Sequence, residues 1–163
     1  MAKGASSAKF FSGRALALLL IAGPALATPA FAGEITPDGF YRAETRKSFD
    51  EVVDELKRAI SEHNFRLAAH NRIGAAIRER NGGDFPEYDT LQFCNLAYAE
   101  ELLRLDPEGV RHMPCTITVH SRDGKVIVYA RQLPSSPNDT RLRDFAAGMN
   151  GQIRAIVDEG TGK

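Results

Sequence analysis

The stretch Cys115–Arg131, with the sequence CTITVHSRDGKVIVYAR, decides the fold class of this chain. It contains two runs that favour β-structure, Cys115–Ser121 and Val126–Arg131, on either side of Arg122-Asp123-Gly124-Lys125. Asp-Gly between two such runs is a strong short-range signal for a β-hairpin, because both residues tolerate a positive φ. The stretch therefore predicts two neighbouring antiparallel strands.

Strand and helix patterns alternate along the chain on both sides of this hairpin. Further strands are predicted at Phe40–Thr45, Phe65–Ala69 and Tyr88–Cys94. Helices are predicted from Phe49 to near His63, over Arg72–Arg80 and Leu96–Leu105, and from about Thr140 to Asp158. The order β-α-β-α-β-α-β-β-α predicts an α+β fold of two layers: a mainly antiparallel sheet with helices packed on one face.

The predicted helices carry recognisable start signals. Ser48-Phe49-Asp50-Glu51 has the pattern of a capping box. Asn71 and Asn95 are the residues expected to cap the second and third helices.

The first 32 residues resemble a secretory signal peptide. Three basic residues precede the apolar run Ala15–Ala22, and this stretch contains no acidic residue. Two Ala-x-Ala sites follow the run. Cleavage is predicted after Ala32, with Ala27 as the second choice, and the protein is expected to be periplasmic or secreted. The apolar run is shorter than the roughly 20 residues that a membrane-spanning helix needs, so no membrane association is expected after cleavage.

The remaining chain has the size of one domain. The expected division is a short segment at 33–39, one domain at 40–158 and a flexible tail at 159–163. Without the leader, 18 basic residues stand against 21 acidic residues. This balance does not favour nucleic acid as a partner, because phosphate binding needs an excess of positive charge.

Several segments, in their order along the chain, resemble the domain-of-unknown-function 302 family from about Phe40 to Ile156. The segments that carry this resemblance are Ser48–Val53, Ile60–Phe65, Phe93-Cys94-Asn95, Met113-Pro114-Cys115 and Asp123–Val126. The resemblance implies a two-layer fold like that of the TATA-binding protein, often a homodimer, and no established activity.

The chain departs from the family pattern at three places. Many members carry Gly where Cys94 stands, Leu where Cys115 stands, and Asn-Pro where this chain has Asn95-Leu96. The two cysteines together indicate an exported two-cysteine subgroup.

Cys94 and Cys115 are the only cysteines, and three interpretations stay open. A pair of cysteines in an exported protein favours a disulfide, which would stabilise the fold by about 3 kcal/mol in the chain-entropy model. Strand alternation argues against it, since Cys94 shares a face with Thr90 and Gln92 whereas Cys115 shares a face with Ile117.

The second interpretation is a metal or haem site. His112-Met113-Pro114-Cys115 places an imidazole, a thioether and a thiol within four residues, and such soft ligands suit Cu(I). Cys94 and His70 complete the list of candidate ligands, with copper or haem as the candidate cofactor.

The third interpretation is a reactive thiol, because Cys94 directly precedes a predicted helix N-terminus. No catalytic residues are assigned, since hydrolase motifs such as G-x-S-x-G and H-E-x-x-H do not occur. The favoured function is therefore an exported module that binds a small ligand, a metal or a protein. The alternatives are a thiol-redox or sulfur-transfer protein and a structural domain with a Cys94–Cys115 disulfide.

Overall fold

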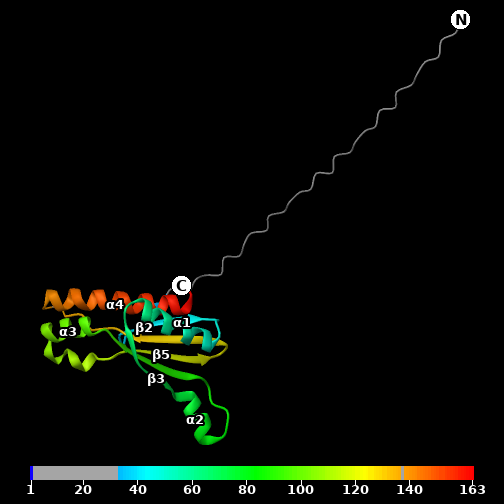
Figure 1. Ribbon diagram of the computed structural model, residues 1–163, viewed down its shortest axis with the longest axis horizontal. Helices are drawn as coiled ribbons and strands as arrows, with labels where there is room; N and C mark the ends of the chain where they lie inside the picture. Colours follow the sequence, from blue (N-terminus) through cyan, green and yellow to red (C-terminus); the bar gives the residue numbers. More distant parts are fainter. Residues whose placement is uncertain (2–32, 137) are drawn as a thin grey trace.

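The computed structural model describes Met1, residues 33–136 and residues 138–163 (Figure 1). The predicted signal peptide therefore lies outside the described residues, apart from Met1. The described chain forms a six-stranded sheet in the order β1-β2-β6-β5-β4-β3, with every neighbouring pair antiparallel. The strands are β1 (Glu34–Ile35), β2 (Phe40–Thr45), β3 (Arg66–Arg72), β4 (Tyr88–Cys94), β5 (Cys115–Arg122) and β6 (Lys125–Arg131). The helices are α1 (Phe49–Glu62), α2 (Ile73–Asn81), α3 (Leu96–Leu105), the 3-10 helix η1 (Pro107–His112) and α4 (Thr140–Thr161).

The α+β fold predicted from the sequence is confirmed. The hairpin lies at the centre of the sheet, and Arg122 pairs with Lys125 across the turn. Asp123 and Gly124 both have positive φ, at 52° and 71°, as the Asp-Gly signal requires. The first helix begins where the capping box predicts, since the Ser48 side chain accepts from the Glu51 amide at 3.3 Å.

Helices α1 and α4 lie side by side and cover one face of the sheet (Figure 1). Between the two layers, the inward side chains of the strands meet the apolar stripes of both helices. The fully buried side chains at this contact include Leu56, Ile60, Leu91, Phe93, Ile117, Val128, Ile153 and Ile156. Helix α3 and η1 lie at the end where α4 begins, whereas α2 projects from the β3–β4 edge, away from the helix layer (Figure 1).

The start of α2 differs from the prediction. Strand β3 continues to Arg72, three residues further than expected, because its pairing with β4 continues to Asp89. Asn71 therefore lies within the strand, where its amide donates to the Thr90 hydroxyl at 3.2 Å instead of capping a helix. The N-cap is Arg72, whose side chain makes no capping hydrogen bond.

The C-terminal end also differs, because α4 continues into the expected tail and ends at Thr161. Gly160 and Thr161 are buried, and the Thr161 hydroxyl donates to the Val157 carbonyl at 2.8 Å. A side chain at position 160 would run into α1, since a Cβ there would lie 2.6 Å from Leu56 Cγ. Burial against α1 explains why these residues form helix.

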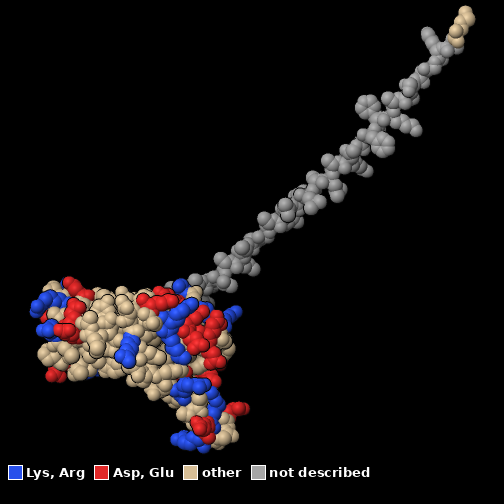
Figure 2. All heavy atoms as spheres, in the orientation of Figure 1, with Lys and Arg blue, Asp and Glu red and all other residues tan. Residues whose placement is uncertain are grey.

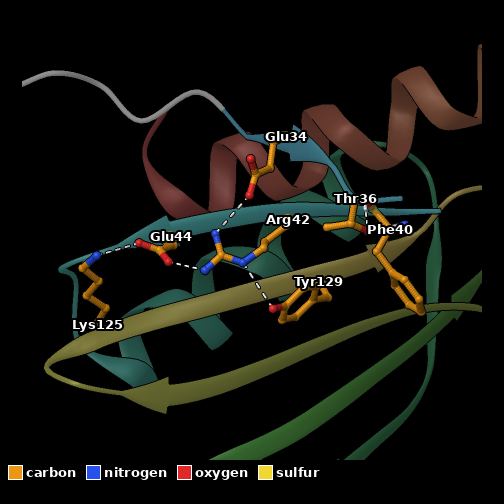
Figure 3. Close-up of polar contacts among 7 residues, drawn as sticks. All are labelled: Glu34, Thr36, Phe40, Arg42, Glu44, Lys125 and Tyr129. Atoms are coloured by element: carbon orange, nitrogen blue, oxygen red, sulfur yellow. Dashed lines mark hydrogen bonds and ion pairs between the residues drawn. The ribbon is translucent and has the colours of Figure 1, made fainter. Parts of the chain in front are cut away.

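The opposite face of the sheet carries polar and aromatic side chains, because strand residues alternate between the two faces. In β2, Tyr41 and Ala43 are buried, whereas Arg42 lies on the outer face among Glu34, Glu44 and Tyr129 (Figure 3). Lys125 extends this group by an ion pair with Glu44 at 2.8 Å. Hydrogen bonds from Lys125 and then Arg42 lower the pKa of Glu44.

An aromatic row crosses this outer face from β4 to β2. Its ring centroids are separated by 5.5 to 6.2 Å, in the order Phe85, Tyr88, His120, Tyr129 and Phe40. His120, which alternation places on the outer face, is therefore held between two aromatic rings. Figure 2 shows that positive and negative side chains are intermixed on the viewed side of the molecule, as expected for a nearly neutral chain.

The close contact between α4 and α1 leads to a stability prediction with a built-in control. Gly160→Ala should lower the free energy of unfolding by about 1–3 kcal/mol, because the added methyl group overpacks the contact with Leu56. Gly148→Ala in the same helix meets no atom within 4 Å, and should raise stability by about 0.5–1 kcal/mol. Urea denaturation of both variants checks this, and equal effects at the two positions would contradict the packing argument.

Candidate functional site

A small apolar pocket lies where β4 and β5 meet α3, η1 and the first half of α4. Four of the five site residues predicted from the sequence line it: Cys94, His112, Met113 and Cys115. The remaining lining residues are mainly apolar: Phe65, Asn95, Tyr98, Ala99, Leu102, Leu133, Phe145 and Met149. The fold thus brings together one residue at the end of β4 and three residues around the start of β5.

The two cysteines reach this pocket from neighbouring strands. Cys115 lies directly opposite Phe93 in the β4–β5 ladder, and therefore on the inner face of the sheet. Cys94 is the last residue of β4, and α3 begins two residues later at Leu96, after its cap Asn95. The strand alternation argument placed the two cysteines on opposite faces, but both side chains border the same pocket at this strand end. Both are free thiols.

The Cys115 thiol lies in a poorly solvated environment. Burial raises its pKa to about 11, and the nearby Cys94 adds to the shift. With this pKa, Cys115 is protonated at neutral pH. It is therefore unreactive, because the thiolate is the nucleophilic form.

His112 lies at the point where the pocket meets two wider hollows. Burial lowers its pKa, and the positive charge of Arg111 lowers it further, so its imidazole is neutral at pH 7. One hollow, of about 280 Å³, is bordered by η1, the segment after β6 and the start of α4. The other, of about 510 Å³, is bordered by the β1–β2 turn, the end of β6 and the middle of α4. All three spaces share His112 and Leu133 in their linings, so they adjoin one another, and we refer to them together as the branched cleft.

The segment after β6 is held against α4 by a single amide side chain. The Leu133 amide donates to Asn150 Oδ1 at 2.7 Å, and Asn150 Nδ2 donates to the Leu133 carbonyl at 2.9 Å. This reciprocal pair satisfies both backbone groups of Leu133. It also fixes the apolar side chain that all three branches of the cleft share.

Polar groups without protein partners line the 510 Å³ branch. Both polar atoms of the Gln132 side-chain amide are buried and have no hydrogen-bond partner among the residues that the structure describes. Arg154 is half-buried in the same wall, and within the described chain no carboxylate lies within 4 Å of its guanidinium. Buried polar groups in proteins are nearly always hydrogen-bonded, so an unpartnered amide in a cleft wall indicates a place where a ligand can bind.

His70, the fifth predicted residue, does not line the pocket. Its Nε2 atom lies 2.6 Å from Asp89 Oδ2, and this carboxylate is buried. The imidazole thus provides the partner that a buried carboxylate needs. Within the described part of the chain, no three His, Cys, Asp or Glu side chains are grouped so that they could hold a metal ion. A metal in the pocket would therefore depend on the two thiols and the Met113 thioether.

The sequence analysis missed the α4 and β6 sides of the cleft. Phe145 and Met149 pack against the core and also line the pocket. Gln132 and Asn150 carried no pattern of their own. Their only sequence signal was their position beside the Pro134-containing loop and on the helix that follows it.

Comparisons with known proteins agree with this architecture. The family model described as "Domain of unknown function DUF302" matches residues 41–160. A solved structure, the uncharacterized conserved protein DUF302 from Bacillus stearothermophilus, superposes with a TM-score of 0.63 at 20% sequence identity. The match covers 74% of this chain and 96% of that chain, so it supports the fold. A search of curated proteins finds no match. No helix in the described residues is long and apolar enough to cross a membrane.

Proposed function

Since this chain belongs to the DUF302 family, for which no specific function is known, we propose from the site itself that it is a small-molecule-binding domain. The ligand would occupy the branched cleft around His112 and Leu133. The observation that carries this proposal is that three hollows adjoin around His112 and Leu133, of which the two wider ones measure about 280 and 510 Å³. Ligand sites typically have volumes of several hundred Å³ and combine apolar walls with a few polar groups.

The lining of the cleft combines apolar walls with a few polar groups. Leu133, Phe145 and Leu102 supply apolar surface, whereas His112 and Gln132 supply polar groups. The neutral imidazole of His112 can both donate and accept a hydrogen bond. Binding is favoured over nucleophilic catalysis by Cys115, because the pKa of this thiol is raised to about 11.

A second candidate function is the binding of a soft metal ion at the inner pocket. The observation that favours it is the presence of two free thiols and the Met113 thioether around one apolar space. Thiolate and thioether sulfurs suit Cu(I), which accepts low coordination numbers. The metal would have to displace the Cys115 proton, so its affinity should rise with pH.

Export and dimerisation are further proposals. The basic, apolar and Ala-x-Ala order of the first 32 residues supports export. The outer face of the sheet supports self-association, since its aromatic row leaves Phe85 and Tyr88 each more than one-third exposed. The disulfide in an oxidising compartment stays a further proposal, supported by the influence of the nearby Cys94 on the Cys115 thiol.

Small-molecule binding can be tested with 1-octanol as a neutral apolar probe. Amide resonances of the ¹⁵N-labelled protein should shift around Leu133 and Phe145, where the branches of the cleft join. Ser135→Trp should weaken the binding at least tenfold, because the indole fills the mouth shared by both wider branches. Ser61→Trp, an equally exposed change on α1, is the matched control. Absence of saturable shifts in the cleft would refute the proposal.

Cu(I) binding can be tested by competition with bicinchoninate under reducing conditions. The protein should retain one Cu(I), with higher affinity at pH 8 than at pH 6.5. Cys94→Ser or Cys115→Ser should abolish retention, and Met113→Leu should weaken it. His120→Gln, on the opposite face of the sheet, should change nothing. Complete transfer of copper to the competitor at both pH values would exclude this function.

Export and dimerisation can be measured on protein isolated from the exported fraction. N-terminal sequencing should begin at Gly33, and light scattering should give twice the mass of one chain. An N-terminus at Met1 would contradict cleavage, and the mass of a single chain at micromolar concentration would contradict dimerisation.

A further inference from the structure

The wall of the 510 Å³ branch contains a buried amide that the protein itself leaves unpaired. Gln132 follows the last residue of β6, and its backbone amide donates to the Gly39 carbonyl at 3.0 Å. Its side-chain Nε2 and Oε1 are both removed from solvent, and neither has a hydrogen-bond partner in the described part of the chain. Such a group costs stability. An apolar residue of similar size would avoid this cost, so the amide is explained if a bound ligand draws the side chain toward the branch and pairs with it.

A cation borders the same space. Arg154 lies one helical turn after Asn150, the residue that anchors Leu133, and both border this branch. The nearest acidic residue along that face of α4 is Asp158, which accepts a hydrogen bond from the Tyr41 hydroxyl at 2.6 Å. The charge of Arg154 acts on the nearby Tyr41, but within the described residues no hydrogen bond or ion pair engages its guanidinium, and a guanidinium matches the two oxygens of a carboxylate.

The other charged groups around this branch lie at its rim. Arg131 is exposed and stacks over the Phe40 ring, with 4.7 Å between its guanidinium carbon and the ring centroid. Asp38, also exposed, lies in the β1–β2 turn, where water screens its charge. Exposed charges at the rim contribute little to affinity. The half-buried Arg154 therefore decides whether a negatively or a positively charged ligand is preferred.

Apolar side chains border the hollows that adjoin this branch. Leu133 borders all three branches, and Phe145 borders the two that lie beyond it. The innermost pocket is surrounded by apolar side chains and the two cysteines. A ligand whose head group contacts Gln132 and Arg154 can therefore place an unbranched apolar tail along Leu133.

We infer that the cleft binds an organic carboxylate with an apolar tail, with the carboxylate held by Arg154 and the Gln132 amide. This inference rests on the proposed small-molecule function and specifies the class of ligand. When the Gln132 side chain turns toward the branch that the residue borders, its Nε2 donates to one carboxylate oxygen, and the Arg154 guanidinium donates to the other. The tail lies against Leu133 and points toward Phe145.

The test compares three probes with the same eight-carbon chain: octanoate, 1-octanol and octylamine. Dissociation constants are measured by NMR titration of the full mature chain at pH 7 and low salt. Octanoate should bind about tenfold more tightly than 1-octanol, the size of effect expected for one charge-assisted contact. Octylamine should bind more weakly than either, because its charge opposes Arg154.

Two variants and a control separate a binding role from a structural role. Arg154→Gln should reduce octanoate affinity to the level of 1-octanol, whereas Arg58→Gln on the exposed side of α1 should leave it unchanged. Gln132→Leu should also weaken octanoate binding, yet raise the melting temperature of the ligand-free protein, because it removes the unpaired amide. A structural Gln132 would give the opposite thermal shift.

The outcomes separate a failure of the carboxylate assignment from a failure of the proposed small-molecule-binding function. If 1-octanol binds in the cleft but octanoate binds no more tightly, the carboxylate assignment is wrong and the small-molecule function stands. If octanoate is preferred and Arg154→Gln leaves that preference intact, the assignment of the head group to Arg154 is overturned. If none of the three probes binds, both fail.

Discussion

The packing of α4 across the whole helix layer is the constraint on which the structure depends. Its second half lies against α1, where Gly160 allows the backbone to approach Leu56. Its first half continues beyond the region covered by α1, toward α3 (Figure 1). There Phe145 and Met149 close the pocket that contains the two cysteines. One helix therefore completes the core at one end and forms the candidate site at the other.

The two faces of the sheet carry different kinds of side chains. The inner face is apolar and excludes water, which explains why the Cys115 thiol remains protonated. The outer face carries a network of Glu34, Arg42, Glu44 and Lys125 beside the aromatic row (Figure 3). This division follows from strand alternation, which sends neighbouring residues such as Tyr41 and Arg42 to opposite sides. The cleft opens at the end of the sheet, where side chains from both layers meet.

Several parts of the candidate site could be recognised in the sequence because they are close together along the chain. His112, Met113 and Cys115 occupy four consecutive positions with Pro114, and any compact fold keeps them near one another. Cys94 was found because an exported protein with two cysteines invites pairing. His70 lies outside this pocket, beside the buried Asp89, and the sequence does not show that contact. Gln132, Asn150 and Arg154 come from different elements, and only packing places them beside the loop after β6.

The sequence by itself determined the elements and their class. The Asp123-Gly124 turn, the Ser48 and Asn95 caps and the apolar periodicities are local signals, and each acts within a few residues. Only the tertiary structure decided the strand order, the extension of α4 to Thr161 and the meeting of Cys94 with Cys115 at a strand end. These features depend on contacts between residues far apart along the chain. Burial against a distant element can override local propensity, as the helical C-terminus shows, and a cleft exists only where such elements meet.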